Sequence, residues 1–174
     1  FGQPIKAQGM SGLSKPAEES RSALKACVDH YFASRGWKPL AFQRETWRAI
    51  AQGQSGLVHA PTGMGKTQAL WLGACMQSLR VHKRSQTANT LNGPTLLWIT
   101  PMRALASDSL SALREPFVDT LWAKRFEVGM RTWDSTSAER QRQARRWPFA
   151  LITTPESLHL ILSRADATAV LGSV

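Results

Sequence analysis

Hydrophobic residues show two different spacing patterns along this chain, and each pattern predicts a different kind of secondary-structure element. Between positions 17 and 36 the apolar side chains recur every three or four residues, which predicts a helix that ends near Gly36. Its expected buried face carries Leu24, Cys27, Val28, Tyr31 and Phe32. The following stretch, "WKPLAFQRETWRAIAQG", predicts a turn and a second helix that closes at Gly53.

Four short segments are apolar along most of their length and predict buried strands. They are "SGLVHA" (55–60), "TLLWIT" (95–100), "FEVGMR" (126–131) and "FALITT" (149–154). Helical patterns follow each of them, beginning near residues 65, 103, 136 and 155, and Thr136 or Ser137 can cap the third. Alternating strands and helices predict an α/β fold, a mainly parallel sheet with helices on both faces. The polar segments 1–17 and 82–94 are expected to form a flexible tail and a surface loop.

The charge balance narrows the class of partner. The sequence has 22 Lys and Arg against 12 Asp and Glu, a formal net charge of +10, which favours a polyanion such as nucleic acid. No window of 18 apolar residues occurs, so no membrane span is expected. Cys27 and Cys75 show no metal or redox spacing, and the four histidines show no ligand spacing. A reducing, cytoplasmic setting is the default expectation.

Each predicted strand is followed by a short motif: "APTG", "TPMR", "RTWD" and "TTPE". Parallel sheets bind their ligands at the carboxyl ends of the strands. The coincidence of four motifs at four strand ends therefore points to one functional edge.

The segment "APTGMGKT" departs from the P-loop pattern G-x-x-x-x-G-K-[ST] only at Ala60. Gly63 and Gly65 allow the backbone to approach phosphate oxygens closely, and the helix that follows adds its positive dipole end. Lys66 would place its charge on the β- and γ-phosphates, and the Thr67 hydroxyl would ligate Mg²⁺. The alternative is an ordinary glycine turn between a strand and a helix.

Five motifs in order resemble a known family. "FQRETW", "APTGMGKT", "ITPMRALASD", "GMRTWDSTSAER" and "TTPESL" are similar to motifs of superfamily-two helicases, within them to the large helicase-related (Lhr) proteins, and especially to bacterial ligase-associated DEXH-box helicases. The resemblance implies a P-loop NTPase domain of the RecA-like type. Residues 18–174 would form an incomplete first RecA-like domain, truncated before the DEXH motif.

The resemblance also implies roles for individual residues. Gln43 would hydrogen-bond the adenine edge, since an amide offers both a donor and an acceptor. The expected nucleotide-binding set is Gln43, Thr62, Gly63, Met64, Gly65, Lys66 and Thr67, with Lys66 and Thr67 also catalytic. The expected nucleic-acid contacts, mostly to the phosphate backbone, are Pro101, Arg103, Ala104, Arg131, Thr132, Thr154, Pro155, Glu156 and Ser157. Thr154 is equally a fair helix cap before a proline at the first helical position.

Three features leave alternatives open. Trp133 stands where related proteins carry glycine, and it could stack on a base. Trp37 and Phe32 could contact the adenine face, but we favour a place in the core for both. The arginines of "ERQRQARRW" form either a phosphate-facing patch or a solvated helix face.

The sequence contains no D-E-x-H tetrad, whose Asp and Glu such a motor needs, and no second RecA-like domain. The leading hypothesis is therefore the ATP-binding portion of a longer ATP-dependent helicase or translocase. By the resemblance it would use ATP and Mg²⁺ and act on DNA, possibly RNA, in DNA repair in the bacterial cytoplasm. The alternatives are a non-enzymatic nucleic-acid-binding module and, least favoured, a P-loop phosphotransferase.

Overall fold

The computed structural model describes residues 15–81, 93–172 and 174, and within them a parallel three-stranded sheet. Its strands are β1 (Leu96–Ile99), β2 (Val128–Arg131) and β3 (Ala150–Thr153), in the order β1-β3-β2. Ala150 pairs with Leu96 on one side and with Val128 on the other, so all three strands end at the same edge. Three of the four predicted strands, and their parallel arrangement, are confirmed.

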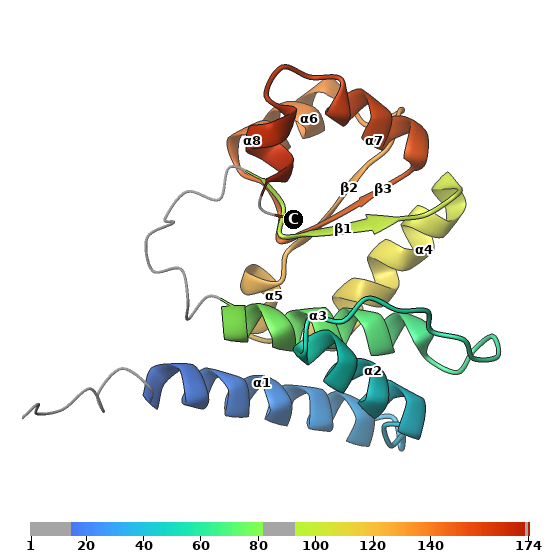
Figure 1. Cartoon of the computed structure of the whole chain (residues 1–174), viewed down its shortest axis with the longest axis vertical. Helices are drawn as coiled ribbons and strands as arrows, with labels where there is room; N and C mark the ends of the chain where they lie inside the picture. Colours follow the sequence, from blue (N-terminus) through green and yellow to red (C-terminus); the bar gives the residue numbers. More distant parts are fainter. Residues whose placement is uncertain (1–14, 82–92, 173) are drawn as a thin grey trace, which may run out of the picture.

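Helices lie on both sides of this sheet (Figure 1). They are α1 (Lys15–Ala33), α2 (Ala41–Ala51), α3 (Lys66–Val81), α4 (Arg103–Arg114), α5 (Trp122–Arg125), α6 (Ser137–Arg145), α7 (Pro155–Leu162) and α8 (Ala167–Leu171), with a 3-10 turn η1 (Glu115–Phe117). The sequence pattern did not predict the short helices α5 and α8. Helix α1 begins at Lys15, so the last three residues of the predicted tail are helical; residues 1–14 and the predicted loop 82–92 lie outside the described residues.

The predicted helix ends are confirmed at Gly36 and Gly53. Gly36 has a φ of +66°, and the amides of Gly36 and Trp37 donate to the carbonyls of Ala33 and Phe32. This is the hydrogen-bond pattern that closes a helix when a glycine adopts the left-handed conformation. The end of α1 thereby turns the chain toward α2, which packs on α3.

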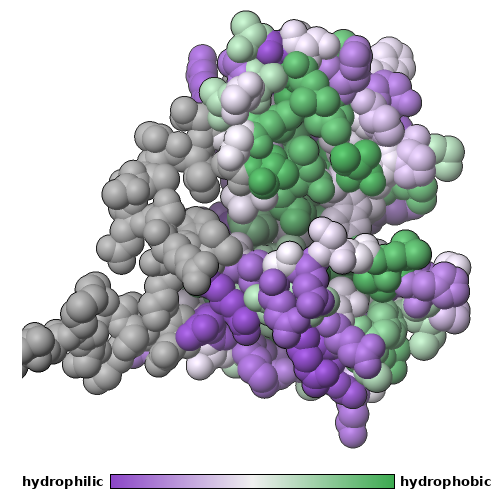
Figure 2. All heavy atoms as spheres, in the orientation of Figure 1, coloured by the Kyte–Doolittle hydropathy of each residue, from purple (hydrophilic) through white to green (hydrophobic). Residues whose placement is uncertain are grey.

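The two faces of the sheet have separate hydrophobic clusters. On the side of α1, α3 and α4, the buried Trp71 ring meets Phe117, Phe126 and Phe149 edge-on at centroid distances of 6.0–6.3 Å. On the other side, Leu151 packs with Ile161 of α7 and Val170 of α8. Figure 2 shows hydrophobic residues gathered at the surface of this second, upper layer, and hydrophilic residues over much of the lower half of the same face. Both faces are covered, as the apolar strands predicted.

The predicted strand 55–60 is wrong. These residues belong to no helix or strand, and Leu57 is 92% exposed. The segment lies beside α2 and α3, where Gln54–His59 line a pocket of about 450 Å³ with Phe42 and Leu70. A strand requires hydrogen bonds to a neighbouring strand, and the described sheet, in the order β1-β3-β2, contains no fourth strand. His59, expected in that strand, is exposed in the same segment.

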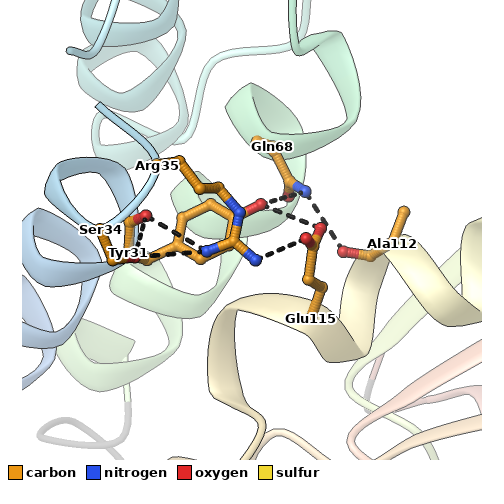
Figure 3. A network of polar contacts seen from close by, with 6 residues as sticks. All are labelled: Tyr31, Ser34, Arg35, Gln68, Ala112 and Glu115. Carbon is orange, nitrogen blue, oxygen red and sulfur yellow. Dashed lines mark hydrogen bonds and ion pairs between the residues drawn. The ribbon is translucent and has the colours of Figure 1, made fainter. Parts of the chain in front are cut away.

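A polar network fixes α1, α3 and the end of α4 against one another (Figure 3). Gln68 Nε2 donates to the Tyr31 hydroxyl at 3.1 Å and to the Ala112 carbonyl at 3.3 Å, and that hydroxyl donates to Glu115 at 3.1 Å. Arg35 pairs with the same carboxylate at 2.5 Å. Burial, followed by the charge of Glu115, raises the pKa of Tyr31 to about 12, so the phenol stays a donor. Gln68 follows the P-loop by one residue, so the network positions the start of α3.

Among the described residues no helix is long and apolar enough to cross a membrane.

Candidate nucleotide and nucleic-acid site

The P-loop residues form a tight turn that opens α3. Gly63 and Gly65 have φ angles of +84° and +79°, a conformation that costs other residues about 1–2 kcal/mol. The amide of Ala69 donates to the carbonyl of Gly65, so the helical hydrogen bonds begin directly at the loop. Thr62 and Met64 are exposed, and Thr67 is half-buried at the first turn. The glycines therefore do supply the backbone geometry for which the motif was singled out.

Lys66 folds back over its own loop. Its Nζ donates to the carbonyl of Ala60 at 2.6 Å and to that of Pro61 at 2.9 Å. The ammonium group is thus held at the centre of the turn by two neutral acceptors. A phosphate oxygen carries a full negative charge and is a stronger acceptor than a carbonyl, so an anion in the loop can take over these donors.

Gln43 lies between α2 and the P-loop and is only 3% exposed. Its Oε1 accepts from the Leu40 amide at 2.8 Å, and its Nε2 donates to the Gly65 carbonyl at 3.1 Å. A primary amide has two N–H groups and two lone pairs, so one donor and one acceptor site stay available for a base. A Cβ on Gly65 would lie 2.7 Å from Gln43 Nε2, so a side chain here would displace the amide and would also strain a backbone with a φ of +79°.

A pocket of about 320 Å³ lies beside Gln43 and the P-loop. It is lined by Phe32, Trp37, Lys38, Leu40, Gln43, Gly63, Met64, Gly65 and Gln68. The apolar walls and the two amides suit a flat heteroaromatic ring with polar edges. The expected core position is correct for Phe32, which is 4% exposed, and wrong for Trp37, which is 54% exposed and lines this pocket. Trp37 reaches the surface because it follows the turn at Gly36.

The three loops after β1, β2 and β3 meet at the carboxyl edge of the sheet. The predicted nucleic-acid contacts fall into two groups there. Those with exposed side chains are Pro101, Arg103, Ala104, Pro155 and Glu156. Thr132, Thr154 and Ser157 are buried, and Arg131 is half-buried. The first group can meet a strand directly, whereas the second holds the loops.

The loops after β1 and β2 are joined by an ion pair that the sequence did not predict. Arg103 Nη2 lies 2.8 Å from Asp134 Oδ2, and the Thr132 hydroxyl donates to Asp134 Oδ1 at 2.6 Å. This hydrogen bond, with the nearby cations Arg103 and Arg140, holds the pKa of Asp134 below its usual range. Asp134 therefore stays ionised and partly neutralises Arg103. The pair is evident only in the folded structure, because Arg103 and Asp134 lie far apart in the sequence.

Arg131, predicted to contact the nucleic-acid strand, is half-buried. Its guanidinium lies over the Trp147 ring at 5.6 Å, and its Nη1 is buried without a hydrogen-bond partner. Burial, and then repulsion from Arg164 and Arg140, lower the pKa of this guanidinium. An unpartnered buried donor next to a loop edge is costly unless an acceptor reaches it.

The start of α7 is held by its own side chains. The Thr154 hydroxyl lies 3.3 Å from that of Ser157, and both residues are buried. Hydrogen bonds from the Glu156 amide and from Thr154 lower the pKa of the Glu156 carboxyl. A carboxylate repels a phosphate, so Glu156 is better suited to fixing the helix start than to touching a nucleic-acid strand.

The basic helix α6 does not present its arginines to one edge. Thr136 caps it as predicted, with its hydroxyl accepting from the Glu139 amide at 3.2 Å. Arg140 donates to the Trp133 carbonyl at 2.6 Å near the functional edge, whereas Arg146 approaches Glu127, before β2, at 3.8 Å. The first turn of α6 therefore lies near the site, as a phosphate-facing patch requires. The end of the helix lies away from the site, as a solvated helix face would.

Comparison with known proteins agrees with this arrangement. The DEAD/DEAH box helicase family matches residues 40–174. The chain is 36% identical over 152 residues to the "Lhr helicase/uracil glycosylase" of Escherichia coli, and 34% identical over 150 residues to the Lhr helicase of Mycolicibacterium smegmatis. The matches cover 78% and 82% of this chain, and the chain spans only 10% of each of these relatives.

A solved structure supports the same relationship. It is that of the Mycobacterium smegmatis helicase Lhr bound to ssDNA and AMP-PNP, with a TM-score of 0.65 and 34% sequence identity. The similarity covers 86% of this chain and 19% of the other. A family match over more than half of the chain, with a parallel sheet, a P-loop and motif loops at one edge, places this chain in the DEAD/DEAH box helicase family.

Proposed function

We propose that this chain is the ATP-binding and strand-contacting part of a longer ATP-dependent helicase or translocase that acts on single-stranded DNA. The observation that carries this proposal is the shared carboxyl edge of the sheet, where the motifs "TPMR" and "TTPE" follow β1 and β3 and expose their last residues. Helix α4, which begins in the first of these motifs, is hydrogen-bonded to the P-loop helix α3. The two relatives named above are Lhr helicases, a further relative from Methanocaldococcus jannaschii is named "ATP-dependent helicase Lhr-Core", and the structural neighbour is bound to ssDNA and AMP-PNP.

The residues at the P-loop fit a nucleoside triphosphate with Mg²⁺. Two left-handed glycines, a lysine held above the turn and a threonine at the first helical turn are the donors such a ligand requires. The magnesium ion, when bound, neutralises charge on the phosphates. Lys66 would leave the Ala60 and Pro61 carbonyls for phosphate oxygens, Thr67 would supply a metal ligand, and the free sites of the Gln43 amide would orient the base.

Hydrolysis needs carboxylates that this sequence does not contribute in a D-E-x-H tetrad. Among the described residues no cluster of three His, Cys, Asp or Glu side chains is placed to hold a metal ion. We therefore propose that residues 18–174 belong to a first RecA-like domain, and that the acidic motif and a second domain come from the rest of the parent protein. The 174 residues alone should hydrolyse ATP negligibly, and robust turnover that Lys66→Ala abolishes would refute this.

Strand contact would come from Arg103 and the backbone at Pro101, Ala104 and Pro155. Such contacts fix the position of a strand without reading its sequence, as a moving motor requires. They do not separate DNA from RNA, because none of them reads a 2′-hydroxyl. DNA is proposed because of the structural neighbour, and a role in DNA repair and a bacterial cytoplasmic location because of the family resemblance.

The decisive experiment measures ATP hydrolysis by the parent protein with and without oligothymidylate. The helicase proposal predicts that single-stranded DNA stimulates ATP hydrolysis and that Lys66→Ala abolishes most of this hydrolysis. A phosphotransferase would show no stimulation by the strand. A binding module without catalysis would bind the strand equally with and without ATP, and either result would overturn the proposal.

A further inference from the structure

We propose that Trp133 is a stacking platform for one unpaired base of the bound strand, an inference that rests on the proposed function. Trp133 follows β2 at the functional edge and its side chain is 70% exposed. Aromatic side chains beside cations are the usual means by which proteins hold single strands without sequence preference. None of the motif residues predicted to contact the strand offers such a ring.

The loop that carries Trp133 is held by several hydrogen bonds and an ion pair. The Thr132 amide donates to the Ser135 hydroxyl at 3.0 Å, and the Ser135 amide donates to the Thr132 carbonyl at 3.0 Å. Asp134 is held by Thr132 and Arg103, and the Trp133 carbonyl by Arg140 at 2.6 Å. The neighbours of Trp133 thus use their side chains to fix the turn, while its own ring is left largely in solvent. A ring on a fixed backbone loses little conformational freedom when it binds.

The charges around the loop suit a strand that passes over the ring. Arg103 is 60% exposed and pairs with the residue after Trp133, and Arg140 holds the carbonyl of Trp133 itself. Arg131 precedes the loop and keeps a buried Nη1 without a partner. A phosphate beside a stacked base would find the exposed guanidinium of Arg103 at the same edge of the sheet.

Single exposed hydrophobic residues are common and by themselves indicate nothing. Leu121 is 96% exposed on the connection before α5, away from every motif, and is the ordinary case. Trp133 differs because its carbonyl accepts from Arg140, the residues on both sides of it are held by hydrogen bonds and an ion pair, and it lies at the edge where the strand-contact motifs converge. The occupant that matches a flat exposed ring in a loop held by Arg140 and Arg103 is an unpaired nucleobase.

The test uses the parent protein with two probes of equal length, oligothymidylate and an abasic oligodeoxynucleotide. Trp133→Ala should weaken binding of oligothymidylate roughly 5- to 150-fold, as expected for one base stack. Binding of the abasic strand, which keeps its phosphates, should not change. Trp133→Phe should retain most of the affinity, and Leu121→Ala should match the unaltered protein. The melting temperature of each variant checks that the exposed substitution leaves the fold intact.

Three outcomes would overturn the inference. Unchanged affinity of Trp133→Ala for oligothymidylate would show that no base stacks there. An equal loss for both probes would assign Trp133 to loop structure or phosphate contact. Failure of the unaltered protein to bind either probe would overturn the proposed function itself, and the stacking role with it.

Discussion

The P-loop region and the carboxyl edge of the sheet both carry the motifs of the family, yet the chain holds them by different means. The edge loops follow strands that are paired in the sheet, and the end of β3 is buried, with Thr153 at 0% and Thr154 at 5% exposure. The P-loop follows a segment that belongs to no strand and exposes Leu57. Its shape depends instead on Gln43 and on the contacts of Lys66 with its own loop.

This difference separates what the sheet determines from what the ligand can change. The hydrogen bonds between the β-strands fix the start of each edge loop whether or not a nucleic-acid strand is bound. The contacts of Lys66 are with carbonyls that a phosphate can replace, so the P-loop is the more adaptable region. The two regions are connected through α3 and α4, which are joined by the hydrogen bond from Gln68 to the Ala112 carbonyl (Figure 3).

The largest loss of stability is expected from a substitution in the hydrophobic core that the two regions share. Trp71 is fully buried on α3 among Phe117, Phe126 and Phe149, so Trp71→Ala should lower the free energy of unfolding by about 3–5 kcal/mol. Trp71→Phe should cost less, because it fills much of the space and removes an indole N–H that has no partner. Denaturant unfolding measures both, and the exposed Leu121→Ala should stay within about 0.5 kcal/mol. A small effect of Trp71→Ala would mean that the two regions are stabilised independently.

Lys66→Ala comes next and should affect the P-loop region alone. Loss of one charge-stabilising donor should lower the rate of ATP hydrolysis of the parent protein roughly 10²- to 10³-fold. Binding of oligothymidylate without nucleotide should not change, because the hydrogen bonds of Lys66 within the described part of the chain go to the P-loop carbonyls of Ala60 and Pro61. Lys124→Ala, an exposed lysine on α5, is the matched control. If Lys66→Ala also weakened nucleotide-free strand binding, the contrast between the two regions would fail.

The same contrast explains which features the sequence could predict. Local patterns sufficed for the caps at Gly36 and Thr136, for the parallel sheet, and for the positions of "TPMR", "RTWD" and "TTPE" at strand ends. Residues 55–60 looked equally apolar, but a strand also needs a neighbouring strand, and that information is not local. The Arg103–Asp134 pair and the exposure of Trp37 likewise depend on how distant segments meet.

Glycine substitutions can separate backbone strain from side-chain contact in the P-loop. Gly65→Ala combines a left-handed φ with a Cβ 2.7 Å from Gln43 Nε2, whereas Gly63→Ala has the same strain with nothing within 4 Å. Strain alone costs about 1–2 kcal/mol, so nucleotide affinity should fall for both variants and further for Gly65→Ala. Gly56→Ala, with neither feature, should match the unaltered protein. Titration calorimetry with a non-hydrolysable ATP analogue measures the order, and equal losses would deny Gln43 its part in shaping the loop.

The smallest expected effect lies at the sheet edge. Asp134→Asn should raise the affinity for oligothymidylate by about 2- to 5-fold at low salt, the range typical of an exposed ion pair. Asp134 now competes with phosphate for Arg103, whose side chain is 60% exposed, and asparagine removes this charge while it can still accept from Thr132. Asp108→Asn on the surface of α4 is the matched control for a lost negative charge.

The gain of Asp134→Asn should shrink as salt is raised, because screening weakens contacts between exposed charges and phosphates. ATP hydrolysis without a strand should not change, since no described contact of Asp134 reaches the P-loop. A loss of affinity instead of a gain would mean that Asp134 holds Arg103 in its binding position and does not compete for it. The edge would then be built to depend on its ion pair, and the loop that presents Trp133 would owe its shape to the same carboxylate.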